Sequence, residues 1–167
     1  QRPRDPGPAP DGVLHGQQFM SPKVQRMPMS YYSEKSGLGI CLQVLGKPQI
    51  RVGAVGLGVG TIATWMRPND YLRIYEINPE VEQLAQQYFS YLKNCEGKYD
   101  FVLGDARLSL EHEPPQNFDI IVLDAFNSDS PPVHLLTKEA FDVYLKHLSP
   151  DGVIMVHATS SYLDFFP

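Results

Sequence analysis

From about residue 50 onward, short runs of aliphatic residues alternate with amphipathic stretches. Each run is apolar without a strict polar alternation, which suits a parallel sheet that is covered on both faces. Strands that alternate with helical segments are typical of βαβ units. The pattern therefore predicts an α/β fold with a mostly parallel sheet and helices on both faces. The candidate strands are residues 51–55, 72–75, 101–103, 120–123 and 153–156.

Two helices are predicted between these strands. Asn78 and Pro79 suit the cap and first turn of one helix, and Thr137 can cap the other. The apolar residues that follow each cap recur at helical spacing, which predicts one buried face per helix. These faces are Val81, Leu84, Ala85, Tyr88, Phe89 and Leu92 in the first helix, and Phe141, Tyr144, Leu145 and Leu148 in the second. Residues 149–152 then predict a turn into the last strand.

The chain divides into three predicted parts, of which only one is large enough for a core. Residues 1–12 are rich in proline and charge and predict a flexible tail. Residues 13–48 contain short apolar runs split by glycine and proline, and they predict a small N-terminal β-hairpin that leads into the sheet. Residues 49–167 predict a single Rossmann-like domain, in keeping with a total length of 167 residues.

Composition narrows the classes of partner. A net charge of -5 argues against nucleic acid, which requires clustered lysine and arginine. The two cysteines, Cys41 and Cys95, lie outside any CxxC pattern, so neither a disulfide framework nor a zinc site is indicated, and a reducing cytoplasmic setting is expected. No stretch reaches the ~18 apolar residues of a membrane-spanning helix. The five histidines lack ligand spacing, so they are interpreted as structural or surface residues and no metal is predicted.

A glycine motif follows the first predicted strand. Gly56, Gly58 and Gly60 stand where that strand ends and a helical segment begins. Glycines at this point let the backbone turn tightly and approach a ligand closely. The spacing is GxGxG, which by itself is also explained by a tight turn between a strand and a helix.

Carboxylates at the ends of the next three predicted strands strengthen the interpretation of the glycine motif as part of a binding site. Glu76 lies 20 residues beyond Gly56, a distance at which an acid can accept hydrogen bonds from ribose hydroxyls. Asp105 ends the third strand and can bind an adenine amino group, cap the following helix, or do both. Asp124 ends the fourth strand. Since ligands bind outside the carboxyl ends of parallel strands, these residues predict one nucleoside-binding crevice in residues 49–167.

Four segments in this order resemble the motifs of the spermidine synthase family. They are Gly56-Leu57-Gly58-Val59-Gly60, Tyr75-Glu76-Ile77-Asn78-Pro79, Gly104-Asp105-Ala106-Arg107 and Leu123-Asp124-Ala125-Phe126. Upstream, residues 13–18 resemble the leucine-aspartate-glycine segment of that family and its nearby glutamine. The resemblance extends from about Val13 to Leu163 and implies a Rossmann-like fold of the S-adenosylmethionine-dependent methyltransferase type.

The resemblance also implies roles for single residues. Glu76 would bind the ribose of S-adenosylmethionine or of its decarboxylated form, and Asp105 with Ala106 would bind the adenine. Gln18 would lie near the cofactor and Tyr32 near the substrate. Asp124 stands where spermidine synthases have the catalytic aspartate that receives the amine. The implied partner is a small-molecule amine, and a homodimer is compatible with the resemblance.

The chain departs from the family pattern at three places. Asp124 and Asp129 are five residues apart, whereas the family has a compact Asp-x-x-Asp-Pro box. Asp129 can therefore be a second amine anchor or simply a residue of a proline-rich loop. His15 stands where the family usually has aspartate. The sequence ends soon after the fifth predicted strand, which implies a fragment or a relative shortened at its C-terminus.

The favoured activity is transfer of an aminopropyl group to an amine such as putrescine, with Asp124 steering and deprotonating the amine. A primary amine has a pKa of about 10.4 and must lose a proton before it attacks. One alternative is a methyltransferase on the same fold, and another is a nucleoside-binding module without catalysis. A NAD-dependent dehydrogenase is disfavoured by the GxGxG spacing.

Overall fold

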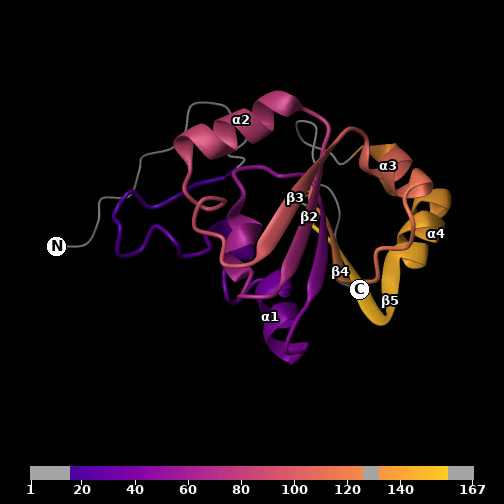
Figure 1. Ribbon diagram of the computed structural model, residues 1–167, viewed down its shortest axis with the longest axis horizontal. Coiled ribbons are helices and arrows are strands. Elements are labelled where there is room, and N and C mark those ends of the chain that lie inside the picture. The colour runs from indigo at the N-terminus through magenta and orange to yellow at the C-terminus, as the bar shows by residue number, and fades with distance from the viewer. Residues whose placement is uncertain (1–15, 126–131, 158–167) are drawn as a thin grey trace, which may run out of the picture.

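The computed structural model describes residues 16–125 and 132–157, which form one sheet flanked by helices (Figure 1). The sheet has the order β3-β2-β1-β4-β5, and every neighbouring pair of strands is parallel. The predicted parallel α/β fold is thereby confirmed, and each predicted strand overlaps an observed one. The strands are β1 (Arg51–Val55), β2 (Tyr71–Glu76), β3 (Lys98–Leu103), β4 (Phe118–Leu123) and β5 (Leu148–Val156).

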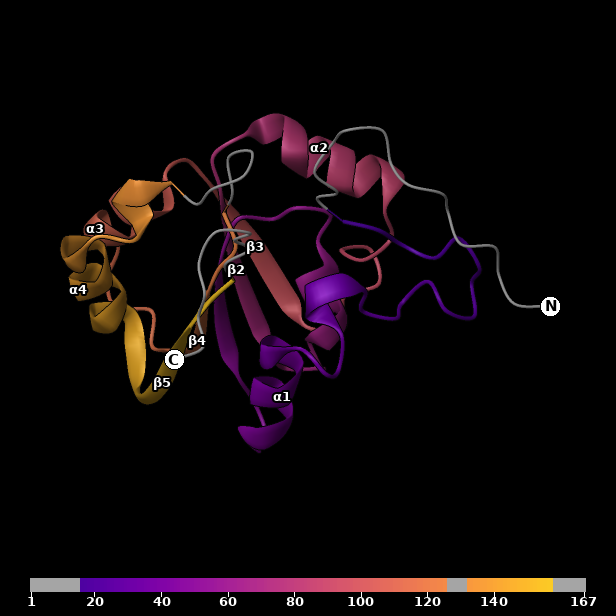
Figure 2. The same cartoon turned by 180° about the vertical axis from the view of Figure 1, so that it is seen from behind.

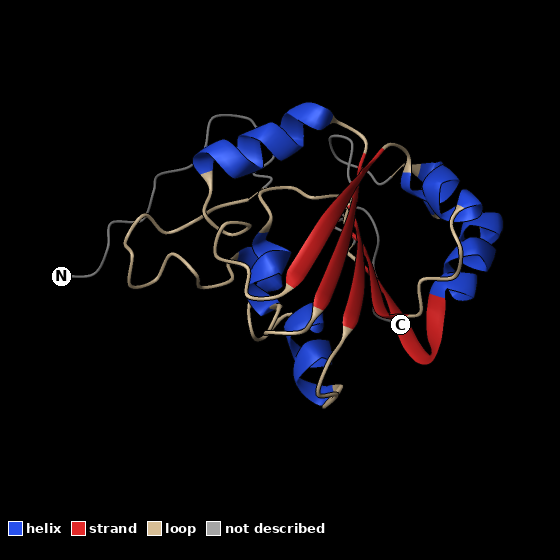
Figure 3. Cartoon of the chain, viewed as in Figure 1, coloured by secondary structure: helices blue, strands red, loops and turns tan. Residues whose placement is uncertain are grey.

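Helices cover both faces of the sheet, as Figures 1 and 3 show. α1 (Gly37–Val44) and α2 (Pro79–Tyr88) pack on one face, and α3 (Ala106–His112) and α4 (Lys138–His147) pack on the other. The view from behind in Figure 2 shows the same division. The described residues also form the short 3-10 helices η1 (Ser30–Tyr32), η2 (Thr61–Trp65) and η3 (Val133–Leu135).

The side chains of successive residues in the central strands pack into two separate hydrophobic cores. In β4, Ile120 and Val122 join the core beneath α1 and α2, whereas Ile121 and Leu123 join the core beneath α3 and α4. All six residues of β4 are buried. Side chains alternate across a strand, so the part of β4 with a core on each face, Ile120 to Leu123, must be apolar. The buried Asp119 before it accepts hydrogen bonds from Lys47 and the Arg51 N–H. The requirement for apolar residues explains why continuous aliphatic runs located the strands correctly.

The strand order creates a switch point between β1 and β4. The chain passes from β1 outward to β2 and β3, and then crosses back to place β4 on the other side of β1. In such sheets the crevice at the carboxyl ends of the two strands that flank the switch point is the preferred ligand site. The segments that follow β1 and β4 therefore lie side by side at the position predicted for binding.

The predicted N-terminal β-hairpin is wrong for the residues that the structure describes. Residues 16–50 contain η1 and α1 and no strand. Ser36 caps α1 by accepting a hydrogen bond from the Gly39 N–H. A Cβ at Gly39 would lie 2.3 Å from the Ser33 carbonyl oxygen, so the entry into this helix depends on glycine. The predicted tail, residues 1–12, lies outside the described residues.

The buried faces of α2 and α4 contain fewer of their apolar residues than the sequence pattern predicted. Leu84 and Tyr88 of α2 are 50% and 64% exposed, whereas Ala85 is buried. In α4, Leu145 is 59% exposed, and Tyr144 is buried as predicted. The predicted turn at 149–152 lies inside β5, where the pairing with β4 shifts register. Within residues 16–125 and 132–157, no helix combines the length and apolarity needed to cross a membrane.

Candidate functional site

The glycine loop joins β1 to η2 and adopts a backbone that favours glycine. Gly56, Gly58 and Gly60 have φ angles of 94°, 55° and 82°. A Cβ at Gly56 would lie 2.5 Å from the carbonyl oxygen of Asp124, so glycine is required where this loop meets the end of β4. The N–H of Asp124 also donates to the Val55 carbonyl at 2.9 Å. The loop and Asp124 are therefore fixed against one another by backbone contacts.

Glu76, at the end of β2, faces the glycine loop. One carboxylate oxygen accepts a hydrogen bond from the Leu57 N–H at 2.9 Å, and the other accepts one from the Asn78 N–H at 2.9 Å. The first bond crosses from β2 to the loop after β1, so it sets the distance between the acid and the loop. The sequence spacing predicted this proximity correctly.

Asp105 caps α3 and pairs with a histidine. Its carboxylate accepts a hydrogen bond from the Leu108 N–H at 2.9 Å and lies 2.7 Å from Nε2 of His134. Burial alone would raise the pKa of Asp105, but the Leu108 N–H and His134 outweigh it and lower that pKa. The helix-cap interpretation is confirmed, while adenine binding by Asp105 and the buried Ala106 stays a prediction.

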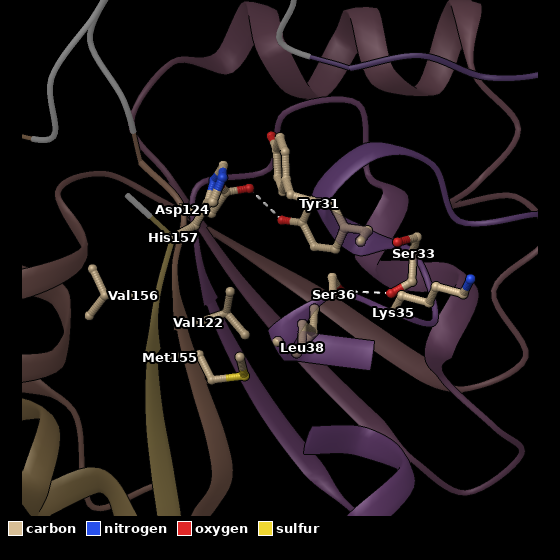
Figure 4. Close-up of a pocket in the computed structure, with 12 residues that line it drawn as sticks. Tyr31, Ser33, Lys35, Ser36, Leu38, Val122, Asp124, Met155, Val156 and His157 are labelled. Atoms are coloured by element: carbon tan, nitrogen blue, oxygen red, sulfur yellow. Dashed lines mark hydrogen bonds and ion pairs between the residues drawn. The ribbon is translucent and has the colours of Figure 1, made fainter. Parts of the chain in front are cut away.

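Asp124 lies in a cluster of polar aromatic side chains. One carboxylate oxygen accepts a hydrogen bond from the Tyr32 hydroxyl at 2.5 Å, and the other lies 2.7 Å from Nδ1 of His157. The His157 ring stacks on Tyr31 with 3.7 Å between ring centroids. Figure 4 shows Asp124 and His157 together at the ends of β4 and β5. Burial and then the Asp124 charge raise the pKa of both tyrosines, so both phenols stay protonated at neutral pH.

A cavity of about 390 Å³ opens beside this cluster, between the segment around η1 and the ends of β4 and β5 (Figure 4). A second cavity, of only about 10 Å³, lies against the glycine loop. Tyr31, Tyr32 and Asp124 line both cavities, so Asp124 lies at their junction. The larger cavity is lined by Tyr31, Tyr32, Ser33, Lys35, Ser36, Gly37, Leu38, Val122, Asp124, Met155, Val156 and His157.

Of the predicted site residues that the structure describes, Asp124 and Tyr32 line both cavities and Gly58 lines the smaller one, whereas Glu76, Asp105, Ala106 and Gln18 line neither. The Gln18 side chain donates to Ser90 Oγ at 2.8 Å and accepts from the Ser90 N–H at 2.9 Å, so it ties the N-terminal segment to the residues after α2. Its neighbour Gln17 lines the smaller cavity instead. Asp129 and His15 lie outside the described residues.

The sequence interpretation missed His157. All five histidines were expected to be structural or on the surface, yet His157 lines the larger cavity and pairs with Asp124. The missing signal was its position: it follows β5 directly, at the same edge of the sheet as Glu76, Asp105 and Asp124. Within the part of the chain that the structure describes, no group of three or more histidine, cysteine, aspartate or glutamate residues could hold a metal ion.

These features define a class of protein: an α/β fold of the S-adenosylmethionine-dependent methyltransferase type, with a glycine loop after β1 and acids at the carboxyl ends of β2, β3 and β4. Solved structures share this fold. A probable spermidine synthase from Corynebacterium glutamicum has a TM-score of 0.60 at 22% identity and covers 70% of this chain and 43% of its own. Human methyltransferase-like protein 13, solved in complex with SAH, has a TM-score of 0.55 at 23% identity and covers 70% and 59%.

Curated relatives point to a narrower group. A polyamine aminopropyltransferase of Vibrio vulnificus (strain CMCP6) is 32% identical over 120 residues, which are 69% of this chain and 39% of the relative. A putative O-methyltransferase of Mycolicibacterium vanbaalenii is 29% identical over 107 residues, which are 62% of this chain and 44% of the relative. The chain thus spans about two fifths of each relative. No protein-family profile matches the chain. The chain is thus similar to parts of proteins that are named as transferases.

Proposed function

We propose that this chain is the nucleoside-binding part of a spermidine-synthase-like transferase, which moves an aminopropyl group from decarboxylated S-adenosylmethionine to an amine. The observation that carries the proposal is the position of Asp124 at the junction of two cavities, one of which adjoins the glycine loop. A transferase needs two substrates side by side, with the reacting atoms at the boundary. The V. vulnificus relative, named as a polyamine aminopropyltransferase, supports the same activity.

The nucleoside would bind along the glycine loop and the ends of β2 and β3. Gly58 leaves room for close approach of a ligand because it has no Cβ, whereas a Cβ at Gly56 or Gly60 would meet Asp124 or Leu92. Each Glu76 oxygen accepts one backbone N–H in this structure and has a second lone pair for a ribose hydroxyl. Asp105 and Ala106 would contact the adenine. The SAH complex of the human neighbour supports a ligand of the S-adenosylmethionine type.

The amine would bind in the larger cavity, next to Asp124. A carboxylate there attracts a cationic amine, and the Tyr32 hydroxyl holds this carboxylate in one orientation. Transfer is a displacement at a carbon attached to a sulfonium, so the main task of the protein is to align the amine with that carbon. Tyr32 lines both cavities and would contact the substrate at the reacting end. Asp129 remains a proposed second anchor outside the described residues.

Methyl transfer is the second candidate function. The larger cavity is bounded partly by apolar side chains, including Leu38, Val122 and Met155, which suit an acceptor with an apolar body. The M. vanbaalenii relative, named as a putative O-methyltransferase, favours this alternative. The choice between the two depends on which donor binds and which group moves.

Calorimetric titration tests the cofactor site. We expect wild type to bind S-adenosylmethionine or its decarboxylated form and not NAD. Glu76→Gln should weaken binding roughly 10- to 100-fold, because a hydrogen bond to a charged group contributes about 1.5–3 kcal/mol. Glu80→Gln is the matched control, since Glu80 is an exposed acid in the first turn of α2. Binding of NAD alone would contradict the proposal.

Transfer assays test the reaction itself. With decarboxylated S-adenosylmethionine and putrescine, Asp124→Asn should lower the rate by about 10²–10⁴-fold and leave cofactor affinity unchanged. Transfer of a methyl group from S-adenosylmethionine, without any aminopropyl transfer, would replace the favoured function by the second candidate.

A further inference from the structure

His134 connects the ends of two strands that are not neighbours in the sheet. It belongs to η3, which follows β4 in the chain, yet its Nε2 lies 2.7 Å from a carboxylate oxygen of Asp105, just after β3. In the sheet, β2 and β1 lie between β3 and β4. The contact therefore joins a segment that follows β4 to the acid that the proposed function assigns to the adenine.

The backbone beside His134 is anchored to α4. The next residue, Leu135, is buried in the core beneath α3 and α4. Its carbonyl oxygen accepts a hydrogen bond from the buried Tyr144 hydroxyl of α4 at 3.0 Å. Figures 1 and 2 show α3 and α4 side by side. The His134 side chain therefore reaches Asp105 from a fixed base.

The contact between His134 and Asp105 is not needed to cap α3. The other oxygen of Asp105 accepts the Leu108 N–H at 2.9 Å, which satisfies the cap without the histidine. The His134 side chain is 51% exposed, and exposed pairs of this kind contribute little to folding. The contact is better explained by what it does to the Asp105 carboxylate.

Two donors fix the Asp105 carboxylate and leave it able to accept further hydrogen bonds. Each oxygen accepts one, from the Leu108 N–H or from His134, and keeps a second lone pair. A neutral ring with its proton on Nε2 and a charged ring both supply the histidine donor, so the contact does not depend on titration. Burial acts to raise the pKa of Asp105, but the two hydrogen bonds outweigh it and lower that pKa. The group is thus an ionised acceptor, which binds an amino group and repels a carbonyl oxygen.

We propose that His134 is a positioning residue for the nucleoside base: it holds the Asp105 carboxylate in the orientation that accepts the amino group of adenine. The inference rests on the proposed function, in which Asp105 contacts the adenine. His134 acts through the carboxylate and not by touching the ligand. It thereby contributes to the choice of an adenosyl donor over one whose base has a carbonyl oxygen in place of the amino group.

Calorimetric titration with S-adenosylhomocysteine and with its inosine counterpart tests this role. Wild type should prefer the adenine compound at least about 10-fold. His134→Ala should weaken binding of the adenine compound roughly 3- to 10-fold and change the affinity for the inosine compound little, so the preference shrinks. His134→Gln should retain most of the preference, because its amide still donates to Asp105. His112→Ala is the matched control, since His112 is an exposed histidine of α3.

A double-mutant cycle separates positioning from direct contact with the ligand. Asp105→Ser removes the carboxylate and keeps a side chain that can cap α3. In this background His134→Ala should cause no further loss of affinity. An equal loss in both backgrounds, an unchanged preference in His134→Ala, or tighter binding of the adenine compound by that variant would overturn this inference alone. A wild type that binds neither compound would instead contradict the proposed function.

Discussion

Gly56 is constrained both by its own backbone conformation and by its contact with Asp124 of the candidate site. Its φ of 94° disfavours any residue with a Cβ, and that Cβ would overlap the Asp124 carbonyl. We expect Gly56→Ala to lower the free energy of unfolding by about 3 kcal/mol, because strain and steric overlap add. Urea unfolding measures this loss.

Gly46→Ala is the control for Gly56→Ala. Gly46 also has a positive φ, 58°, but its added Cβ would meet only the Val44 carbonyl oxygen at 3.6 Å. We expect this variant to lose about 1 kcal/mol from backbone strain alone. Equal losses in the two variants would show that contact with Asp124 is unimportant at position 56.

Asp70 is a fully buried acid that ties the start of β2 to the rest of the sheet. Its carboxylate accepts hydrogen bonds from the Ile50 N–H and from the backbone and guanidinium of Arg67. Burial would raise the pKa of Asp70, but the Arg67 and Ile50 hydrogen bonds outweigh burial and lower it. The carboxylate is therefore stabilised in the folded protein relative to the unfolded chain.

Asp70→Asn should cost about 3 kcal/mol of unfolding free energy at pH 7, because it removes the charge from a buried, fully hydrogen-bonded group. Since the folded pKa lies below the unfolded one, the contribution of Asp70 is complete above the ordinary value of 3.8 and is lost as pH falls through the lowered value. Urea unfolding at pH 7 and pH 3 should show the difference shrinking. Asp142→Asn, which removes an exposed acid of α4, should change little at either pH; a constant difference for Asp70→Asn would contradict this account.

Single residues of the site were predictable where a strand end fixed them. Glu76 and Asp124 could be located because aliphatic runs give the strand ends, and parallel strands end at one edge. Gln18 could not, since the contacts of its segment are made with Ser90, 72 residues further along the chain. The position of His157 directly after β5 was predictable in the same way. Its pairing with Asp124 was not, because the two residues are 33 positions apart and leave no local spacing pattern.

At the scale of the element, His147 joins two helices on one face of the sheet. It belongs to α4, is buried, and its Nε2 lies 2.8 Å from the Leu110 carbonyl oxygen of α3. A carbonyl oxygen accepts, so Nε2 carries the proton, and Nδ1 has no hydrogen-bond partner among the described residues. Burial lowers the pKa of His147, and the ring must stay neutral for the two helices to pack as they do.

The stability of wild type should fall as pH drops below the ordinary histidine value of 6.5, because the unfolded chain then binds a proton that folded His147 does not. Above that pH His147 contributes no pH dependence. His147→Gln keeps a donor for the Leu110 carbonyl and removes the titration, so wild type should lose up to about 2 kcal/mol more than the variant between pH 7 and pH 5. Urea unfolding at pH 7, 6 and 5 gives the comparison, and parallel pH profiles would refute the role of His147.

The elements themselves were predictable to different degrees. β1 and β4 followed from their aliphatic composition, because burial on both faces requires it. α1 did not, since residues 39–44 contain apolar residues at spacings that also suit a strand. What determines the helix is a cap at Ser36 and a close backbone approach at Gly39, both of which depend on the preceding turn. Ile40 and Val44 remain exposed, so hydrophobicity alone could not identify the buried face.

At the scale of the whole molecule, the strands of the sheet contribute side chains to a hydrophobic core on each face. We therefore expect the two layers, each made of one core and the helices that cover it, to unfold together. Ile120 and Ile121 are neighbours in β4 but belong to opposite cores. Trp65, the single tryptophan, packs against the core of Ile120 and donates to the Tyr32 carbonyl. Its fluorescence therefore reports on one face of the sheet only.

Ile120→Ala and Ile121→Ala should each lose about 2–5 kcal/mol, because both side chains are fully buried and each deletion leaves a cavity. Rigid pairing of β4 with β1 transmits the loss across the sheet, so Ile121→Ala should shift the Trp65 fluorescence transition in urea as far as the far-ultraviolet circular dichroism transition. If Trp65 kept its wild-type midpoint in Ile121→Ala while the dichroism signal moved, the two layers would be separate folding units. In that case the contacts that Asp124, at the end of β4, makes with Tyr32 and with His157 after β5 would depend on the stability of one layer more than on that of the other.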